Sequence, residues 1–486
     1  MEMKTKTLTP AQLQKQAEKK AREIKKWEKE KARPKRSCYL IYLVLLISLI
    51  YVTDEIASQI NTLMKTEIAN DLMARFGDKS VGMLDVVGFI AVPFQALSIF
   101  YKPLSDRYGR KLFLVVNTFG IGLGLVIISL AQGIVTYILG TVVMMFFVPH
   151  DMQVVYIMES APSNHRAKIF SVIKCVATLG VMLVPLLRKL FMTDAAHWPA
   201  VYLIPGLIGL ASSFIALFFA RETDAFIDSR LRFLRMTEEE LEAERQKKTA
   251  QDQQGGFVAG LKFALAHKQL RWVFIITALA NFGAIITLHY QVILSYGYAQ
   301  NLLASGQSPT LDAALNAASI GAVTQALFLF PVGSAAAQLL VGFFADLLGR
   351  KQSCIIMTAM AITSFSLFAI GAKHAWNPYL VGLFCGASIG SYWGVTDLGA
   401  MLSSESAPTN LRSSVISAQF LPIGVGYVVA YGVGLPLITL LGNTAVPLVT
   451  LCLAIPGMTA SLILLIAKVH DTKGVDLDKV TGLEWD

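Results

Sequence analysis

Carboxylates interrupt the apolar runs of this 486-residue chain at positions where they could bind a proton or a polar ligand. Asp54 and Glu55 lie near the end of the first run, and Gln59 follows Glu55 by four residues, on the same face of a helix. Ionisable groups in such runs are costly, and burial helps a carboxylate to hold a proton near neutral pH. If the run continues past residue 53, these acids face a cavity; if it ends there, they are interfacial groups.

A second pair of acids recurs at matching positions in the two halves of the chain. Asp151, which follows His150, and Asp397 are 246 residues apart, and each precedes a glutamate by eight residues. Eight helical residues correspond to roughly 12 Å. The two acids are therefore either a symmetric binding pair or inward extensions of charged clusters at the helix ends.

Bases and amides complete the set of candidate binding residues. Lys174 is the one cation that we expect near the core of the first half, unless its long chain carries the ammonium back to the membrane surface. His289 lies within a later apolar run. Further candidates, each of which could equally pack between helices, are Gln95, Asn281, Gln291, Gln338, Tyr392, Trp393 and Gln419.

The composition places these residues in a polytopic membrane protein. Hydrophobic residues make up 54% of the chain and charged residues only 15%, whereas soluble proteins carry about 25% charge. The apolar runs approach the roughly 20 residues that a helix needs to cross a bilayer. The net charge of +9 collects at helix ends, so we expect no nucleic-acid partner. No nucleotide-binding loop or metal-ligand spacing is present, and we expect no cofactor, no bound metal and no enzymatic activity.

The apolar pattern predicts twelve transmembrane helices, with residues 63–80 and 296–318 as the two larger outer loops. The predicted spans are 38–62, 81–101, 112–131, 134–157, 167–190, 200–220, 271–295, 319–342, 352–372, 378–401, 413–440 and 445–467.

These spans define the domains and the orientation. Residues 38–220 and 271–467 are the two six-helix halves, and residues 221–270 are a cytoplasmic linker with surface helices. Lys and Arg concentrate on one side, which predicts that the basic segment 1–37 and the tail 468–486 are both cytoplasmic. Residues 1–37 form either a solvated tail or a helix that lies on an anionic leaflet.

Two charged segments occur once in each half. Residues 102–111 and 342–351 correspond, with Gly109 and Gly349 placed for a tight reversal between antiparallel helices. Residues 159–166 and 405–412 correspond in the same way. An internal repeat of this kind predicts a binding site between the two halves.

These segments resemble the major facilitator superfamily, whose loop pattern is Gly-x-Leu-Ala-Asp-Arg-x-Gly-Arg-Lys/Arg. Residues 342–351 match it nearly throughout, whereas Lys102 replaces the opening glycine in the first half. The motif style is nearest to sugar and metabolite symporters. The resemblance implies an all-α membrane protein with twelve transmembrane helices in two pseudo-symmetric six-helix bundles. It also implies two cytoplasmic gating clusters, formed by Asp106, Arg110, Glu159 and Arg166 and by Asp346, Arg350, Glu405 and Arg412.

We therefore expect a secondary active transporter that moves a small polar or organic metabolite by alternating access. The excess of intramembrane acids favours proton-coupled symport. The alternatives are a proton-coupled antiporter that exports drugs or metabolites and a non-transporting membrane sensor of the same fold. The expected partners are a small-molecule substrate, protons and membrane lipids. We expect a monomer with several spans in the plasma or inner membrane.

Overall fold

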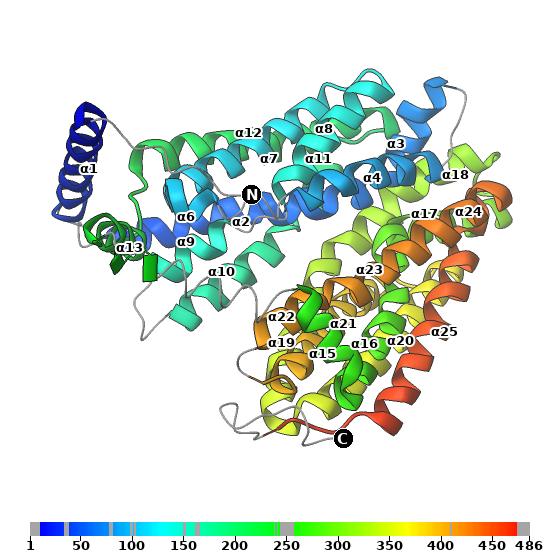
Figure 1. Ribbon diagram of the computed structural model, residues 1–486. Helices are drawn as coiled ribbons and strands as arrows, with labels where there is room; N and C mark the ends of the chain where they lie inside the picture. Colours follow the sequence, from blue (N-terminus) through cyan, green and yellow to red (C-terminus); the bar gives the residue numbers. More distant parts are fainter. Residues whose placement is uncertain are drawn as a thin grey trace.

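Every regular element in the described part of the chain is helical, as the apolar runs predict (Figure 1). The computed structural model describes residues 10–33, 38–76, 81–97, 101, 104–148, 152–160, 166–237, 239–240, 242–243, 257–408 and 411–473.

The first half comprises eight principal helices. Two of the predicted spans each consist of two successive helices, α8 with α9 and α10 with α11. The bounds are α2 (Tyr39–Leu63), α4 (Val81–Ala96), α7 (Arg110–Ser129), α8 (Ile134–Phe147), α9 (Met152–Ser160), α10 (Arg166–Gly180), α11 (Leu183–Phe191) and α12 (Trp198–Phe219). The short α6 (Leu104–Tyr108) precedes α7.

The second half repeats this order. Its helices are α16 (Lys268–Ala280), α17 (Ala284–Ala304), α18 (Leu311–Ala318), α19 (Thr324–Leu348), α20 (Arg350–Lys373), α21 (Pro378–Glu405), α22 (Arg412–Ala418), α23 (Phe420–Val429), α24 (Leu435–Leu441) and α25 (Val446–Lys468). Single turns of irregular helix join several of these, so that α16 continues into α17 through Asn281–Gly283 and α18 into α19 through Ser319–Val323.

In the described residues, nine segments are long and apolar enough to cross a membrane. Each coincides with a predicted span. The three other predicted spans coincide with the shorter α4, the α10–α11 pair and α21. The predicted all-α membrane fold is therefore confirmed.

The prediction of two outer loops is wrong. After α2 the chain continues through α3 (Lys65–Ile68) and two further helical turns to Phe76, and α17 and α18 occupy most of residues 296–318. Lys65, Thr66 and Glu67 are buried, although their polarity suggested an exposed segment. They can remain in a buried helix because each finds polar partners in a neighbouring helix.

The two halves form a V in Figure 1. They meet where α2 and α3 pack against α17, where α10 and α11 pack against α19, and where α4 packs against α24. They diverge toward the ends that carry α13 and α15. One apolar cluster, which includes Ile60, Leu72, Ile286 and Val323, runs through both halves at the closed end and positions them.

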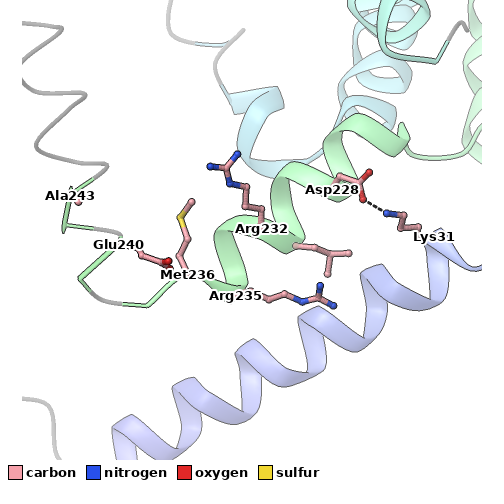
Figure 2. Close-up of a pocket in the computed structure, with 8 residues that line it drawn as sticks. Lys31, Asp228, Arg232, Arg235, Met236, Glu240 and Ala243 are labelled. Carbon is pink, nitrogen blue, oxygen red and sulfur yellow. Dashed lines mark hydrogen bonds and ion pairs between the residues drawn. The ribbon is translucent and has the colours of Figure 1, made fainter. Parts of the chain in front are cut away.

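Two linker helices attach to different halves. Helix α13 (Asp224–Arg235) packs against the N-terminal helix α1 (Pro10–Lys31), as Figure 2 shows, whereas α15 (Phe257–Ala266) packs against α22. Gly260 allows that second contact, because a Cβ there would lie 2.2 Å from the backbone of Ser414. A capping box follows α13, since the backbone N–H groups of Thr237 and Glu240 each donate to the other's side chain.

Candidate functional site

A cavity of about 550 Å³ lies between the two halves. Helices α2, α4, α8 and α10 contribute to its wall from the first half, and α17, α19 and α21 from the second. The wall combines hydroxyl, amide and aromatic side chains with five charged ones. Its polar and aromatic residues include Tyr51, Glu55, Ser58, Gln59, Asn61, Lys65, Asp85, Gln95, Tyr137, Thr141, Lys174, Thr178, Tyr290, Gln338, Trp393, Asp397, Tyr427 and Tyr431.

Seven of the candidate binding residues line this cavity, namely Glu55, Gln59, Gln95, Lys174, Gln338, Trp393 and Asp397. Glu55 accepts a hydrogen bond from Gln59 Nε2 at 2.7 Å, as expected from their spacing on one helical face. Lys174 and Asp397 line the wall from opposite halves, and Lys174 acts electrostatically on that carboxylate. The cavity can therefore hold a solute between an acid of α2 and a charged pair that spans the two halves.

Other predicted residues lie away from the cavity wall. Asp54 is buried and accepts a hydrogen bond from Gln153 Nε2 at 2.9 Å. Tyr392 donates to Asn281 Oδ1 at 2.8 Å and therefore packs between helices. Gln419 likewise donates to the Gly399 carbonyl at 2.9 Å. His150 and Asp151 lie outside the described residues.

A buried triad of ionisable residues closes one end of the cavity and joins the two halves. Lys65 of α3 forms an ion pair with Asp85 of α4 and donates to the Leu288 carbonyl of α17 at 3.0 Å. His289, also on α17, lies with Nε2 3.0 Å from Asp85 Oδ2. The three side chains are at most 7% exposed. His289 was a predicted binding residue, and its place here is at the contact between the halves.

A second buried cluster closes the same end of the molecule. Arg188 of α11 donates to Glu67 Oε1 at 2.6 Å within the first half, and to Thr324 Oγ1 at 3.1 Å in the second. Gln291 Nε2 and Ser319 Oγ, both of the second half, also donate to the Glu67 carboxylate. Because each charged group is hydrogen-bonded, the cluster is tolerated although both ionic side chains are at most 1% exposed.

Sequence reasoning missed this closure. The prediction that Lys174 is the one cation near the core of the first half is wrong, since Lys65 and Arg188 are both buried there, whereas Lys174 is exposed to the cavity. Both buried cations fall at or beyond the ends of the predicted spans, where basic residues usually reach water. The signal that could have found Lys65 is the Lys-Thr-Glu sequence at residues 65–67, which follows the first predicted span with only Leu63 and Met64 between them.

Two ion pairs mark the opposite end of the molecule, one in each half. Arg110 Nε lies 2.9 Å from Glu159 Oε1, and Arg350 Nε lies 3.0 Å from Glu405 Oε1. These pairs have the positions that the internal repeat predicts. They are about one-fifth exposed, and each lies within its own half, so neither joins the halves in this conformation.

Beside each ion pair, a carboxylate that was not among the predicted residues caps the N-terminus of the helix that carries the arginine. Glu222 accepts from the backbone N–H of Arg110 at 2.9 Å, and Asp471 accepts from that of Arg350 at 3.0 Å. The following threonine in each case donates to the paired glutamate, at 2.6 Å for Thr223 and 2.5 Å for Thr472. A carboxylate is favoured there because a helix N-terminus is positive. Burial, together with the nearby Glu159 charge, raises the pKa of Glu222 although the N–H groups lower it.

Gly109 and Gly349 make room for these caps. Their φ angles are +117° and +98°, which confirms that they form the predicted reversals. A Cβ at Gly109 would lie 2.3 Å from Glu222 Oε2, and one at Gly349 would lie 2.1 Å from Asp471 Oδ2. Glycine is therefore required at both positions for backbone conformation and for space.

The remaining predicted cluster residues are only partly described. Arg412 donates to the Ser404 carbonyl at 2.9 Å. Asp106, Arg166 and Asp346 lie in helices, and their side chains are outside the described part of the structure.

Two family models match the chain. The Major Facilitator Superfamily model matches residues 43–326, and the model described as Sugar (and other) transporter matches residues 271–469. Both families are transporters, which agrees with the prediction that the chain is not an enzyme.

Curated relatives match part of the chain. It is 32% identical over 139 residues to a facilitated glucose transporter homolog of Caenorhabditis elegans, which covers 27% of this chain and 25% of that protein. It is 30% identical over 139 residues to the human solute carrier family 2, facilitated glucose transporter member 4, which covers 28% of this chain and 26% of that protein. The matched region thus spans about a quarter of the length of these relatives.

Solved structures match nearly the whole chain. A D-xylose-proton symporter has a TM-score of 0.59 at 16% identity, covering 90% of this chain and 99% of that one. The inward-open xylose transporter of E. coli has a TM-score of 0.59 at 17% identity, covering 92% and 99%. At this identity the likeness establishes the fold, with its two bundles.

Proposed function

Because the chain belongs to the Major Facilitator Superfamily, we propose that it is a secondary transporter that moves a sugar or a similar polar solute by alternating access. The observation that carries this proposal is the cavity between the halves, whose wall both halves share. Rocking of one half would remove its contacts with a solute held there. The site can therefore open alternately to the two sides of the membrane.

The wall chemistry favours a hydroxylated solute. Gln59, Gln95 and Gln338 supply amides that can both donate and accept hydrogen bonds, and Trp393 offers a broad aromatic face. Aromatic faces pack well against the apolar side of a sugar ring, whereas amides bind its hydroxyl groups. The match to the sugar transporter family agrees with this chemistry.

The conformation is proposed to be inward-open. The buried Lys65–Asp85 and Arg188–Glu67 pairs of the first half bind residues of the second half at one end. The Arg110–Glu159 and Arg350–Glu405 pairs lie on the end where the halves diverge. The second end carries the linker helices, with several Lys and Arg residues, and both described chain ends. On the positive-inside rule it is the cytoplasmic end, in a plasma or inner membrane.

The four pairs then have distinct roles in the cycle. We propose that the buried pairs, together with their hydrogen bonds to the second half, are the outer gate, and that those hydrogen bonds break when the cavity opens outward. The Arg110 and Arg350 clusters, with the residues predicted beside them, form the inner gate and meet across the halves in that outward-open state. Breaking such buried contacts is costly unless water or a new partner replaces each one.

Proton coupling is proposed to use the cavity carboxylates. Glu55 and Asp397 face the cavity. Lys174, which acts electrostatically on Asp397, would balance the charge of that carboxylate until a proton binds to it. A carboxylate that is hydrated in one conformation and enclosed in the other changes its proton affinity between them, which is the requirement for coupling. Symport results if solute and proton share the same occluded state.

Uptake into proteoliposomes tests the function. We expect radiolabelled xylose or glucose to accumulate when the lumen is alkaline relative to the bath, and to equilibrate without accumulation when a protonophore is added. Glu55→Gln should abolish accumulation but retain counterflow, because exchange needs no net proton movement. Uptake that equals empty liposomes for a panel of sugars, polyols and amino acids would overturn the transport proposal, and accumulation that ignores the pH gradient would overturn proton coupling alone.

A further inference from the structure

The charged residues of helix α1 lie on two different sides of the helix. One face holds it to α13, where Glu23 lies 2.8 Å from Arg230, Glu28 lies 2.5 Å from Arg235, and Lys31 pairs with Asp228. Figure 2 shows the Lys31–Asp228 pair at the end of this contact. The indole of Trp27 also packs edge-on against Phe226, with ring centroids 5.5 Å apart. Glu23 and Glu28, two of the four acids of α1, thus bind arginines of α13.

The other face is a continuous row of cations. It consists of Lys15, Lys19, Arg22, Lys26 and Lys29, which we call the basic stripe. Their spacings of four, three, four and three residues place all five on one side of the helix. All five are exposed, with Glu18 and Glu30 bordering the stripe and Lys26 Nζ 4.9 Å from the centroid of the Trp27 ring. Such a row of like charges is self-repelling, so a polyanionic partner would stabilise it.

The row lies on a helix beside a membrane-spanning bundle. In Figure 1, α1 runs across the direction of the spans of the first half, beyond their ends. A helix in that position lies roughly parallel to the membrane surface. The apolar side of α1, with Ile24 and Trp27, is the side that packs on α13, so no apolar residue of the opposite side is available to insert among lipid chains. Contact with a surface would therefore be electrostatic.

We propose that the basic stripe of α1 binds the anionic headgroups of the cytoplasmic leaflet. This proposal rests on the orientation given under the proposed function and does not depend on the solute that is transported. Each Lys or Arg near a surface of phosphatidylserine adds to the attraction, and five in one row match the polybasic segments that recognise such surfaces. An acidic protein is the competing partner, and the test below separates the two.

The contact would connect the leaflet to the inner gate. Thr223 caps helix α13 by accepting a hydrogen bond from the Phe226 N–H, and its hydroxyl also donates to Glu159. Headgroups that hold α1 in place would therefore hold α13 and the Glu159 end of the inner gate.

Lysine footprinting of the full-length protein in lipid nanodiscs tests the proposal. An amine-reactive reagent is applied to the protein in discs of phosphatidylcholine alone or of phosphatidylcholine with phosphatidylserine, and labelling is read per lysine by mass spectrometry. We expect labelling of Lys15, Lys19, Lys26 and Lys29 to fall at least about threefold in the anionic discs, and about 0.5 M NaCl to restore it. Lys20 is the matched control, because it is exposed on the same helix but outside the stripe, and its labelling should not change.

Two outcomes would overturn the proposal. Equal labelling of stripe lysines in both discs would show that the lipid is not the partner, and salt-sensitive protection that appears only when a cytosolic extract is added would assign an acidic protein instead. A variant with all five stripe residues changed to Gln supplies a second readout. The thermal midpoint of the wild type should rise when phosphatidylserine is added to detergent micelles, and that of the variant should not.

Discussion

Arg188 and Ser319 join the two halves at their closed end. The Arg188 guanidinium Nη2 lies 2.9 Å from Ser319 Oγ and 3.1 Å from the Ser319 carbonyl, while the same nitrogen holds Glu67 at 2.6 Å. One buried cation thus binds an acid of its own half and, with Thr324 Oγ1 included, three acceptors of the other. Rocking the halves apart at this end must remove the contacts to Ser319.

Replacing Arg188 should open the outer gate. In Arg188→Ala, Glu67 would remain buried without its cation, a change that costs about 3–5 kcal/mol in closed pairs of this kind. The outward-open state should therefore gain population. A cysteine at the cavity residue Ser58, in a background without native cysteines, should react several-fold faster with a membrane-impermeant maleimide added outside.

The control for that experiment is Lys189→Ala. Lys189 is adjacent in sequence but exposed, so its removal should leave the maleimide rate at the wild-type value. An Arg188→Ala rate equal to that of the control would mean that this cluster does not hold the outer side closed.

The Lys65–Asp85 pair should show strong coupling in a double-mutant cycle. Lys65→Met or Asp85→Leu alone leaves a buried charge without its partner and should lower stability by about 3–5 kcal/mol, whereas the double variant should recover much of that loss. Thermal unfolding in detergent measures each step. Additive losses in the double variant would show that the two charges do not stabilise each other.

The two capping carboxylates should have equivalent effects. Glu222→Ala and Asp471→Ala each remove a charged acceptor at a helix N-terminus, and each should cost about 1–2 kcal/mol. Gly349→Ala should lower stability by a similar or larger amount, because its Cβ would displace Asp471 and its φ is positive. Melting midpoints within error of the wild type for all three would contradict the assigned caps.

Lys174 and Asp397, two charges of the cavity wall, should together set how uptake depends on pH. Lys174→Met removes the positive charge that acts on Asp397, so the dependence of uptake on pH should shift. Asp397→Asn should remove that response, and the double variant should resemble Asp397→Asn. If Lys174→Met changes only the apparent affinity for solute at every pH, Lys174 is a solute ligand and not a partner of the proton site.

Docking of α1 on α13 should weaken only in acid. Burial raises the pKa of Glu23, but its hydrogen bond and ion pair with Arg230 lower it by more, so the pKa lies below the ordinary value of 4.5. A depressed carboxylate pKa stabilises the docked state at pH above the unfolded value, and this contribution is lost as the pH falls through the folded value. A distance between spin labels at Ala21 and Ser229 should stay constant from neutral pH to about pH 5 and broaden below about pH 4.5. Glu23→Gln should broaden it at all pH values, and a wild-type distance unchanged at low pH would contradict the role of the Glu23–Arg230 pair.

Several features of this protein follow from its sequence alone. Apolar runs near 20 residues must become helices in a membrane, because a bilayer offers no partner for an unpaired backbone N–H group. Gly109 and Gly349 occupy equivalent positions in the two halves, which predicts a reversal of the chain at each. Glycine is the residue that tolerates positive φ without strain. Helix order, the division into halves and the positions of the Arg110 and Arg350 clusters follow from such local rules.

The outer closure was decided by tertiary structure. Lys65, Glu67, Asp85 and Arg188 look in sequence like charges at span ends, where water would solvate them. They are buried because His289, Gln291, Ser319 and Thr324, over 100 residues later, supply the hydrogen bonds that replace that water. No periodicity in the chain encodes such partners, since they belong to helices that meet only when the two halves pack. The sequence by itself determined which segments cross the membrane, and only the packing of the halves decided which charges between them could be buried.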